Sequence, residues 1–290
     1  MSDEDWSFES PFSSSAASED NKLTLLLSLM DSYAEKGKAL EVLSLCSEFL
    51  ENVQFSANPE SISLVASTAS EVLFAQGRYP EAAWMIELAL EKLEPWESFY
   101  RGFLYRTKVA VTEKLRGKEF AILDARTAIS FFDSEFRDEW AWPVRNRAAR
   151  LLFESMKFNE ALELLELMLS PECDSGQPVV VGIACSLAGQ SKLALGDFVG
   201  AKSLLERAFG CLSIICHNEL GNCLPALADV YVLEGNNAAA LELLEDAALL
   251  EIQPDTRISI LQKSKEIASL PSQDTVSREK CTDLPLFDLD

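Results

Sequence analysis

The sequence predicts an all-α protein, a solenoid of about six stacked helical hairpins closed by a C-terminal capping helix. Three observations support this fold class. A short motif recurs six times at intervals of 39 or 40 residues, and every copy places two small or apolar residues seven positions apart. The chain of 290 residues also holds only 12 Gly and 11 Pro, so long stretches contain neither helix breaker. Repeats of this length are typical of helical solenoids.

The recurring motif marks the turn of each hairpin. In most copies a Gly ends the first helix, A, because Gly adopts the left-handed backbone conformation at low cost. The turns fall at residues 37, 77, 117, 156, 196 and 235. The first marked residues of the second helix, B, are Val42, Ala82, Ala121, Ala161, Ala201 and Ala240, and the second are Phe49, Ala89, Ala128, Met168, Ala208 and Ala247. Seven residues make about two helical turns, so both marked residues face helix A.

Prolines support the same division into repeats. A proline ends a helix or fits its first turn, because it lacks an amide hydrogen. Pro95, Pro143, Pro171, Pro178 and Pro254 are therefore placed between repeats, and Pro225 in the first turn of the sixth helix A.

The repeat resembles the tetratricopeptide repeat (TPR). The fifth copy matches that family's pattern at Gly189, Gly196, Phe198, Ala201 and Ala208, and the sixth at Ala228, Tyr231, Gly235, Ala240 and Ala247. The third copy departs from it, with Val109 or Ala110 at the small position of helix A, and the repeat is longer than the family's usual length of about 34 residues. The resemblance covers residues 22 to 254. It implies a right-handed superhelix with a concave groove lined by the A helices.

Residues 22–270 are expected to form the repeat domain, with residues 255–270 as the capping helix, between acidic disordered tails at residues 1–21 and 271–290. Both tails set apolar side chains among acidic ones, which suits either docking peptides or packing against the chain's own solenoid. The predicted docking residues are Trp6, Phe8, Phe12, Leu286, Phe287 and Leu289. The last five residues resemble a clathrin-box peptide, which would indicate a vesicle-trafficking adaptor. The same tail pattern is similar to peptides that bind transcription and replication factors.

Charge is unevenly distributed. The chain has 25 basic and 47 acidic residues, a net charge of −22, so direct binding to nucleic acid is not expected. Residues 97–150 nevertheless hold eleven basic and eight acidic residues, about +3 against about −25 for the remainder. By repeat register Arg106 of the third helix A, and Asn146 and Arg150 of the fourth, face the groove. In some TPR proteins, basic and Asn residues there hold a peptide carboxylate. We therefore predict that these residues bind an acidic peptide, from a partner or from one of the chain's own tails; a mixed solvated helix face is the alternative.

No catalytic residue, cofactor or metal is predicted. The seven cysteines lack paired spacing and mostly lie in apolar helical runs, which indicates a reducing compartment, the cytoplasm or the nucleus. The single histidine, His217, would complete a zinc site with Cys211, Cys216 and Cys223, but buried thiols explain these cysteines more simply. Nucleotide-binding and hydrolase motifs are lacking from the sequence. The acidic N-terminus is not a targeting peptide, and the apolar run from residue 23 to 30 is too short to insert into a membrane.

These observations predict a non-enzymatic scaffold or adaptor subunit of a multiprotein complex, which binds partner peptides or helices in its groove and uses its tails as further docking motifs. The alternative is a co-chaperone-like or regulatory module that shields a single client peptide. Several stoichiometric partners would favour the adaptor, and one client the alternative.

Overall fold

The computed structural model describes residues 20–52, 58–170, 177–213, 218–249 and 254–270. Thirteen α-helices and no strands lie in these ranges, and none of the helices is long and apolar enough to cross a membrane. The helices are α1 (Asp20–Glu35), α2 (Ala39–Asn52), α3 (Pro59–Ala75), α4 (Tyr79–Lys92), α5 (Ser98–Arg116), α6 (Lys118–Ser134), α7 (Asp138–Glu154), α8 (Phe158–Leu169), α9 (Pro178–Ala194), α10 (Phe198–Ser213), α11 (Leu220–Leu233), α12 (Asn237–Ala248) and α13 (Pro254–Ala268).

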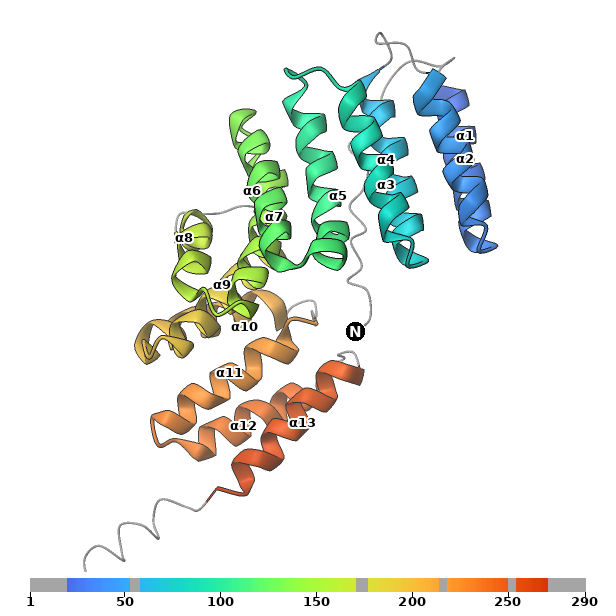
Figure 1. The fold of residues 1–290 in the computed structure, drawn as a ribbon. Coiled ribbons are helices and arrows are strands. Elements are labelled where there is room, and N and C mark those ends of the chain that lie inside the picture. The colour runs from blue at the N-terminus through green and yellow to red at the C-terminus, as the bar shows by residue number, and fades with distance from the viewer. Residues whose placement is uncertain (1–19, 53–57, 171–176, 214–217, 250–253, 271–290) are drawn as a thin grey trace, which may run out of the picture. The chain divides into compact units, whose positions relative to one another are not determined.

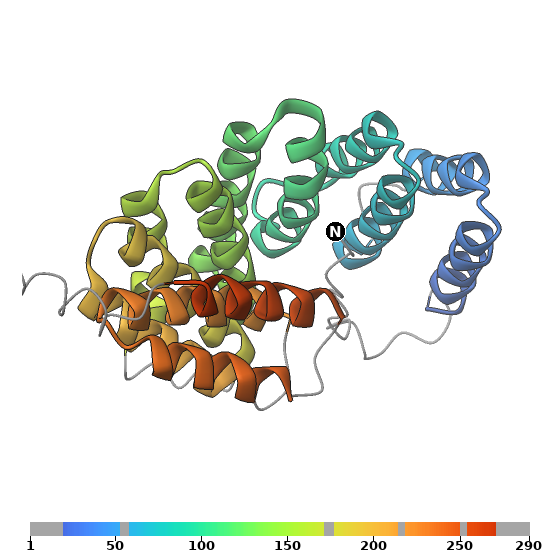
Figure 2. The ribbon, with the colours of Figure 1, turned by 90° about the horizontal axis from the view of Figure 1, so that it is seen from below.

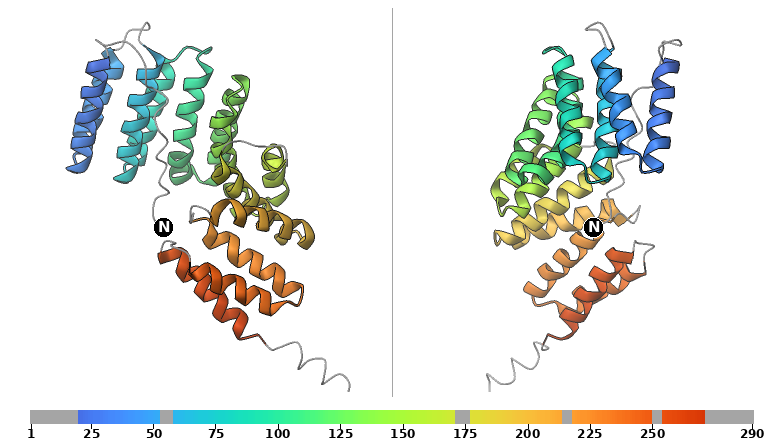
Figure 3. Two further views of the ribbon diagram at one scale, coloured as in Figure 1. Left: turned by 180° about the vertical axis from the view of Figure 1, so that it is seen from behind. Right: turned by 45° about the vertical axis from the view of Figure 1, so that its right-hand side comes forward.

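Successive helices pair as hairpins, so odd-numbered helices up to α11 are the A helices and even-numbered ones the B helices (Figure 1). The first hairpin packs against the second and the second against α5 of the third, and Figure 3 shows these helices from two further directions. The last helix, α13, packs against both α11 and α12, as the three neighbouring helices in Figure 2 show. The predicted fold class, six hairpins and a final helix, is confirmed.

The hairpin turns use the predicted left-handed residue. Gly37, Gly77, Gly117, Gly196 and Gly235 have φ between 67° and 92°, and Met156 takes the same place in the fourth turn with φ 59°. At the fifth turn the Gly196 amide donates to the Leu193 carbonyl at 3.0 Å and the Asp197 amide to the Lys192 carbonyl at 2.9 Å. These two bonds satisfy carbonyls that the end of α9 would otherwise leave unpaired.

The marked residues of the B helices form the contact with the A helices. All six residues at the first marked position are fully buried, from Val42 to Ala240, and so are five of the six at the second. Phe49 is the exception, because it is only partly buried and α2 instead buries Cys46 and Leu50. In the A helix α5, Val109 occupies the position that Gly189 and Ala228 hold in later repeats, and it is buried, with 2% of its surface exposed.

Pro143 lies inside a helix, contrary to the prediction, and Pro225 lies in the sixth helix A as predicted but beyond its first turn. Pro143 is within α7 and Pro225 within α11, each five residues after the helix begins. The prediction was wrong for Pro143 and for the turn that Pro225 occupies, because both helices start earlier than the repeat pattern indicates. A proline near a helix start removes only one main-chain hydrogen bond, so its cost there is limited.

The chain divides into two compact units, unit 1 up to Val144 and unit 2 from Arg145, so the boundary falls within α7. One buried apolar cluster of unit 1 extends from Met30 in α1 to Val111 in α5. A cluster in unit 2 extends from Val181 in α9 to Ile267 in α13. The sequence repeat gives no sign of this boundary, and the single domain over residues 22–270 stays a prediction.

Candidate functional site

Arg106 lies on the third helix A, in unit 1, as its register predicts. Its guanidinium carbon is 4.6 Å from the centre of the Phe103 ring, one turn earlier on α5, and 5.4 Å from the Trp140 ring at the start of α7. Burial lowers the pKa of Arg106, and the negative charge of Glu71 on α3 partly opposes this shift. The group stays charged at neutral pH, because arginine starts from so high a value.

The donors of Arg106 are not used within the described part of the chain. Among those residues, no carboxylate lies within ion-pair distance of the guanidinium and no acceptor takes a hydrogen bond from it. A guanidinium carries five N–H donors in a plane. Two rings thus hold this group, while its N–H donors have no acceptor among the described residues.

The two rings belong to a larger aromatic cluster. The centre of the Phe99 ring lies 5.6 Å from that of Trp140 and 5.8 Å from that of Phe132. The Phe103 and Trp140 ring centres are 6.0 Å apart, and in all three pairs the edge of one ring points toward the other. Phe99 and Trp140 are partly exposed. We call these four side chains, together with Arg106, the arginine–aromatic cluster. Tightly packed rings of this kind hold a side chain in one orientation.

Polar side chains of α3 and α5 lie beside this cluster. The Ser67 and Thr107 hydroxyls are 2.9 Å apart, and Ser67 also donates to a Glu71 carboxylate oxygen at 3.4 Å. Burial raises the pKa of Glu71, against the lowering effects of the Arg106 charge and the Ser67 hydrogen bond. The face formed by α3 and α5 is therefore polar and carries charges of both signs.

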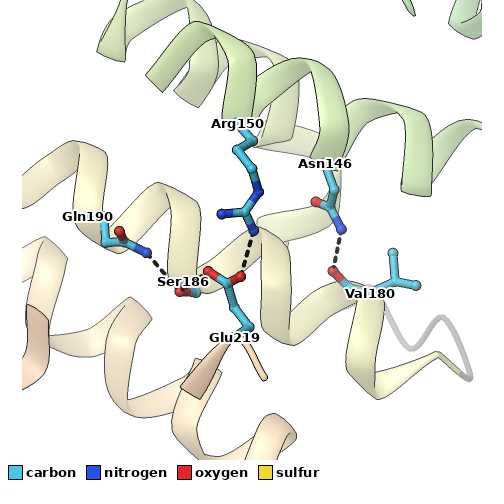
Figure 4. A network of polar contacts seen from close by, with 6 residues as sticks. All are labelled: Asn146, Arg150, Val180, Ser186, Gln190 and Glu219. Atoms are coloured by element: carbon cyan, nitrogen blue, oxygen red, sulfur yellow. Dashed lines mark hydrogen bonds and ion pairs between the residues drawn. The ribbon is translucent and has the colours of Figure 1, made fainter. Parts of the chain in front are cut away.

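Asn146 and Arg150 lie in unit 2 and take part in a network of internal contacts (Figure 4). Arg150 Nη2 donates to Glu219 Oε2 at 2.5 Å, and the Ser186 hydroxyl donates to Glu219 Oε1 at 3.1 Å. Asn146 Nδ2 donates to the Val180 carbonyl at 2.9 Å. These contacts connect α7 with α9 and with Glu219, the residue that precedes α11.

This network is largely enclosed. The side chains of Arg150 and Glu219 are 19% and 4% exposed, and Gln190 extends the network by donating to the Ser186 hydroxyl at 3.0 Å. Sequence reasoning missed Glu219, which lies 69 residues from Arg150 in a connection between repeats. A buried charge must be paired, so the enclosed Arg150 requires a carboxylate partner, but its enclosure follows from the folded structure and could not be read from the sequence.

Other basic residues of the positive segment also serve the fold. Lys108 Nζ lies 2.7 Å from Glu87 of α4 and 3.7 Å from Asp124 of α6, and so connects three successive helices. Burial alone would lower the pKa of Lys108, but the hydrogen bond to Glu87 and the charge of Asp124 raise it overall. Arg101 donates to the Leu90 and Leu93 carbonyls at the end of α4. The excess of basic residues in the sequence thus overstates the positive charge available to a ligand.

Of the four described cysteines, Cys46, Cys185 and Cys223 are buried and Cys211 is partly buried. Burial raises the thiol pKa to about 12 for both Cys46 and Cys223. A protonated thiol is a poor metal ligand. The described residues hold no group of three or more His, Cys, Asp or Glu side chains that could bind a metal ion. Two members of the alternative zinc site, Cys216 and His217, lie outside the described residues, as do all six predicted docking residues of the tails.

No model of a known protein family matches the sequence, and no curated protein matches it. Solved structures do match the arrangement of helices. The apo form of RapI has a TM-score of 0.61 and 14% identity, over 89% of this chain and 85% of that one. A tetratricopeptide repeat protein from Parabacteroides merdae has a TM-score of 0.54 and 15% identity, over 90% of this chain and 94% of that one. The fold is that of TPR proteins.

A further match shows the same fold. BtubC (BKLC) from P. vanneervenii has a TM-score of 0.55 and 14% identity, over 92% of this chain and 96% of that one. In TPR register Arg106 corresponds to Asn146 of the next helix A, and Arg150 lies one turn further along. Neighbouring register positions thus hold, in unit 1, an arginine whose donors have no acceptor in the described part of the chain and, in unit 2, an arginine paired with a carboxylate.

Proposed function

We propose that this protein is a non-enzymatic interaction scaffold, and that unit 1 binds an acidic segment of a partner protein at Arg106. The observation that carries the proposal is the guanidinium held by Phe103 and Trp140, whose donors have no acceptor among the described residues. The contact of an arginine with aromatic rings is favourable by itself. It does not provide hydrogen-bond acceptors for the N–H groups, and a ligand carboxylate provides them well.

The physical gain on binding is substantial for a single side chain. A hydrogen bond that involves a charged group contributes about 1.5–3 kcal/mol, roughly twice a neutral one. Burial has already removed part of the water around Arg106, as its lowered pKa indicates. The guanidinium is therefore already held in one position and partly dehydrated before a partner binds, which lowers the free-energy cost of binding.

The fold itself supports a binding role. One solved structure with this fold is a Rap protein complexed with competence and sporulation factor, with a TM-score of 0.53 and 15% identity. Stacked hairpins leave an extended surface of A helices on which a ligand can lie. An adaptor subunit of a multiprotein complex uses such a surface, and so does a module that holds one client.

Asn146 and Arg150 have a different place in this proposal. Both were predicted to contact the peptide, and that contact stays a prediction. Their contacts with Val180 and Glu219 support a first role in fixing the A helices of unit 2. We further propose that the apolar residues of the two tails, three between Trp6 and Phe12 and three between Leu286 and Leu289, act as docking motifs, and that the protein is located in the cytoplasm or the nucleus. The buried positions of Cys46, Cys185 and Cys223, and the lack of paired spacing among the seven cysteines, favour a reducing compartment.

Quantitative affinity purification tests the proposal, with the full-length chain and the variants Arg106→Gln and Arg126→Gln as bait. Arg126 is exposed on the B helix α6, so it controls for the loss of one positive charge. Partners bound by the wild type and by Arg126→Gln, but lost from Arg106→Gln, support the assignment. An unchanged set of partners would refute it. Several stoichiometric partners identify an adaptor, and a single client identifies the co-chaperone-like alternative.

A further inference from the structure

The arginine–aromatic cluster defines the chemistry of its ligand more closely than a single charge does. The donors of Arg106 have no acceptor among the described residues, and the neighbouring Phe99 and Trp140 side chains are partly exposed. A second cation, Arg137, lies over the Phe99 ring at 5.0 Å, is 47% exposed, and also forms an exposed ion pair with Glu139 at 3.5 Å. A ligand that uses all of these groups needs a carboxylate and an aromatic side chain close together.

The chain carries such a segment itself. Residues 1–19 contain five acidic side chains and no Lys or Arg. Three of the acids directly precede Trp6, and Glu9 directly follows Phe8. In unit 1 the cluster presents Arg106, and Arg137 lies beside it over the Phe99 ring, so this acidic segment provides the charge complementarity that a weak docking contact requires.

The chain that connects this acidic segment to α1 is long enough for the segment to reach Arg106. Asp20, the first residue of α1, follows Phe12 by eight residues, and eight extended residues span up to about 27 Å. Within unit 1, α1 packs on α3 and α3 on α5, so α5 lies about 20 Å from α1 at the usual spacing of packed helices. Arg106 is eight residues from the start of α5, about 12 Å along the helix. The combined separation is about 23 Å, which the linker covers.

We propose that residues 3–12 of this chain bind to the arginine–aromatic cluster of unit 1, with an acidic side chain on Arg106 and an aromatic side chain against Phe99 and Trp140. The inference rests on the proposed function, because both use Arg106 as the binding group. A covalent tether of this length gives an effective concentration on the order of millimolar, so even a weak contact is largely occupied. The segment then competes with an acidic partner for the same arginine, and a partner must displace it.

Photo-crosslinking in the full-length chain tests this inference. The substitution Phe8→p-benzoylphenylalanine places the probe in the segment, and mass spectrometry locates the linked residues. We expect links within one chain to residues 98–106 or 138–143. Their yield should fall about tenfold in Arg106→Gln, as loss of a charged hydrogen bond predicts, and stay unchanged in Arg126→Gln. Links spread over other helices, or a yield that Arg106→Gln does not alter, would overturn the inference. Links only between chains would overturn it as well, since they assign the surface to a second copy.

A second variant leaves the folded units untouched. Neutralising the segment by Asp3→Asn, Glu4→Gln, Asp5→Asn and Glu9→Gln should lower the yield by about the same factor, because it removes the other half of the same contact. An unchanged yield argues against the inference. Comparison with the affinity purification separates the two proposals. Partners lost from Arg106→Gln with an unchanged crosslink refute the tail contact alone, and a lost crosslink with unchanged partners refutes the proposed function alone.

Discussion

The two arginines predicted to face the groove have opposite surroundings. Arg150 of unit 2 is enclosed and paired with Glu219, whereas Arg106 of unit 1 is stacked on two rings and has no acceptor among the described residues. Arg106 lies on the third A helix and Arg150 on the fourth. The residues that arrive from neighbouring helices therefore decide the role of each arginine, which the repeat register alone does not. An enclosed ion pair holds helices together, and an arginine with unused donors is suited to a ligand.

The largest expected effect is the loss of the enclosed ion pair. Glu219→Ala leaves Arg150 without its carboxylate, and we expect it to lower the free energy of unfolding by about 3 kcal/mol, as breaking a buried pair does. Urea unfolding followed by circular dichroism measures this change. Arg150→Met combined with Glu219→Leu should recover most of the loss, because no charge is then left unpaired. A loss below about 1 kcal/mol for Glu219→Ala would show that the network is not structural.

The small position of helix A gives the next largest effect. In unit 1 Val109 fits there, but in unit 2 a Cβ added to Gly189 would lie 2.6 Å from Leu205 Cγ and 3.3 Å from the Ala201 carbonyl oxygen. Gly189→Ala should therefore cost about 2 kcal/mol through overpacking. Gly210→Ala on α10 is the control, since an added Cβ there has no neighbour within 4 Å. We expect it to stabilise the protein by about 0.5–1 kcal/mol through helix propensity. Thermal unfolding that shows the same sign for both would contradict this view of the α9–α10 contact.

Buried thiols allow a test by pH in each unit. The pKa of Cys46 in unit 1 and of Cys223 in unit 2 is raised from 9.0 to about 12 by burial. The unfolded chain thus releases these protons at a lower pH than the folded chain, so stability is fully present below pH 9 and is lost as the pH rises toward 12. At pH 10 each thiol should cost about 1.4 kcal/mol relative to pH 8. Cys46→Ala should remove that part of the decrease, and an equal decrease in variant and wild type would show that Cys46 is not buried in solution.

The smallest expected effect lies in the hairpin turns. All three turns of unit 1 use Gly at positive φ, whereas the fourth turn, in unit 2, has Met156 with φ 59° and an 81% exposed side chain. Met156→Gly relieves the left-handed strain of about 1–2 kcal/mol and loses part of this gain to unfolded-state entropy, so we expect a net stabilisation of about 1 kcal/mol. Gly77→Ala should destabilise unit 1 by a similar amount. If Met156→Gly is destabilising, the Met156 side chain makes contacts that outweigh the strain.

Most of the fold could be predicted from the sequence because equivalent positions make equivalent packing contacts in each copy of the repeat. The residues at the first marked position are all fully buried, and the turns lie where Gly recurs. The exceptions have local causes. Phe49 is too large for a position that other repeats fill mainly with Ala, so Cys46 and Leu50 take the interior in α2. Pro143 and Pro225 lie inside helices that begin before the repeat pattern starts.

The site could be predicted only in part. Register placed Arg106 on the third helix A, but it could not show that Phe103 and Trp140 would stack on it, and the groove-facing position stays a prediction. Register also could not separate Arg106 from Arg150, since that depends on Glu219, a residue two repeats away in a connecting segment. Contacts within a repeat follow from periodicity. Contacts made by residues between repeats depend on the fold of the whole unit, and a repeat pattern holds no information on them.

The most direct test of this contrast is a peptide-display selection on the full-length wild-type chain, followed by affinity measurements with the selected peptides on Arg106→Gln and Arg126→Gln. We predict selected peptides with an acidic and an aromatic residue within two positions of each other. Their affinity should fall about tenfold or more for Arg106→Gln, as loss of a charged hydrogen bond implies, and stay within about twofold for Arg126→Gln. Peptides without acidic residues, or equal affinities for Arg106→Gln and the wild type, would contradict the assignment of Arg106 as the binding arginine.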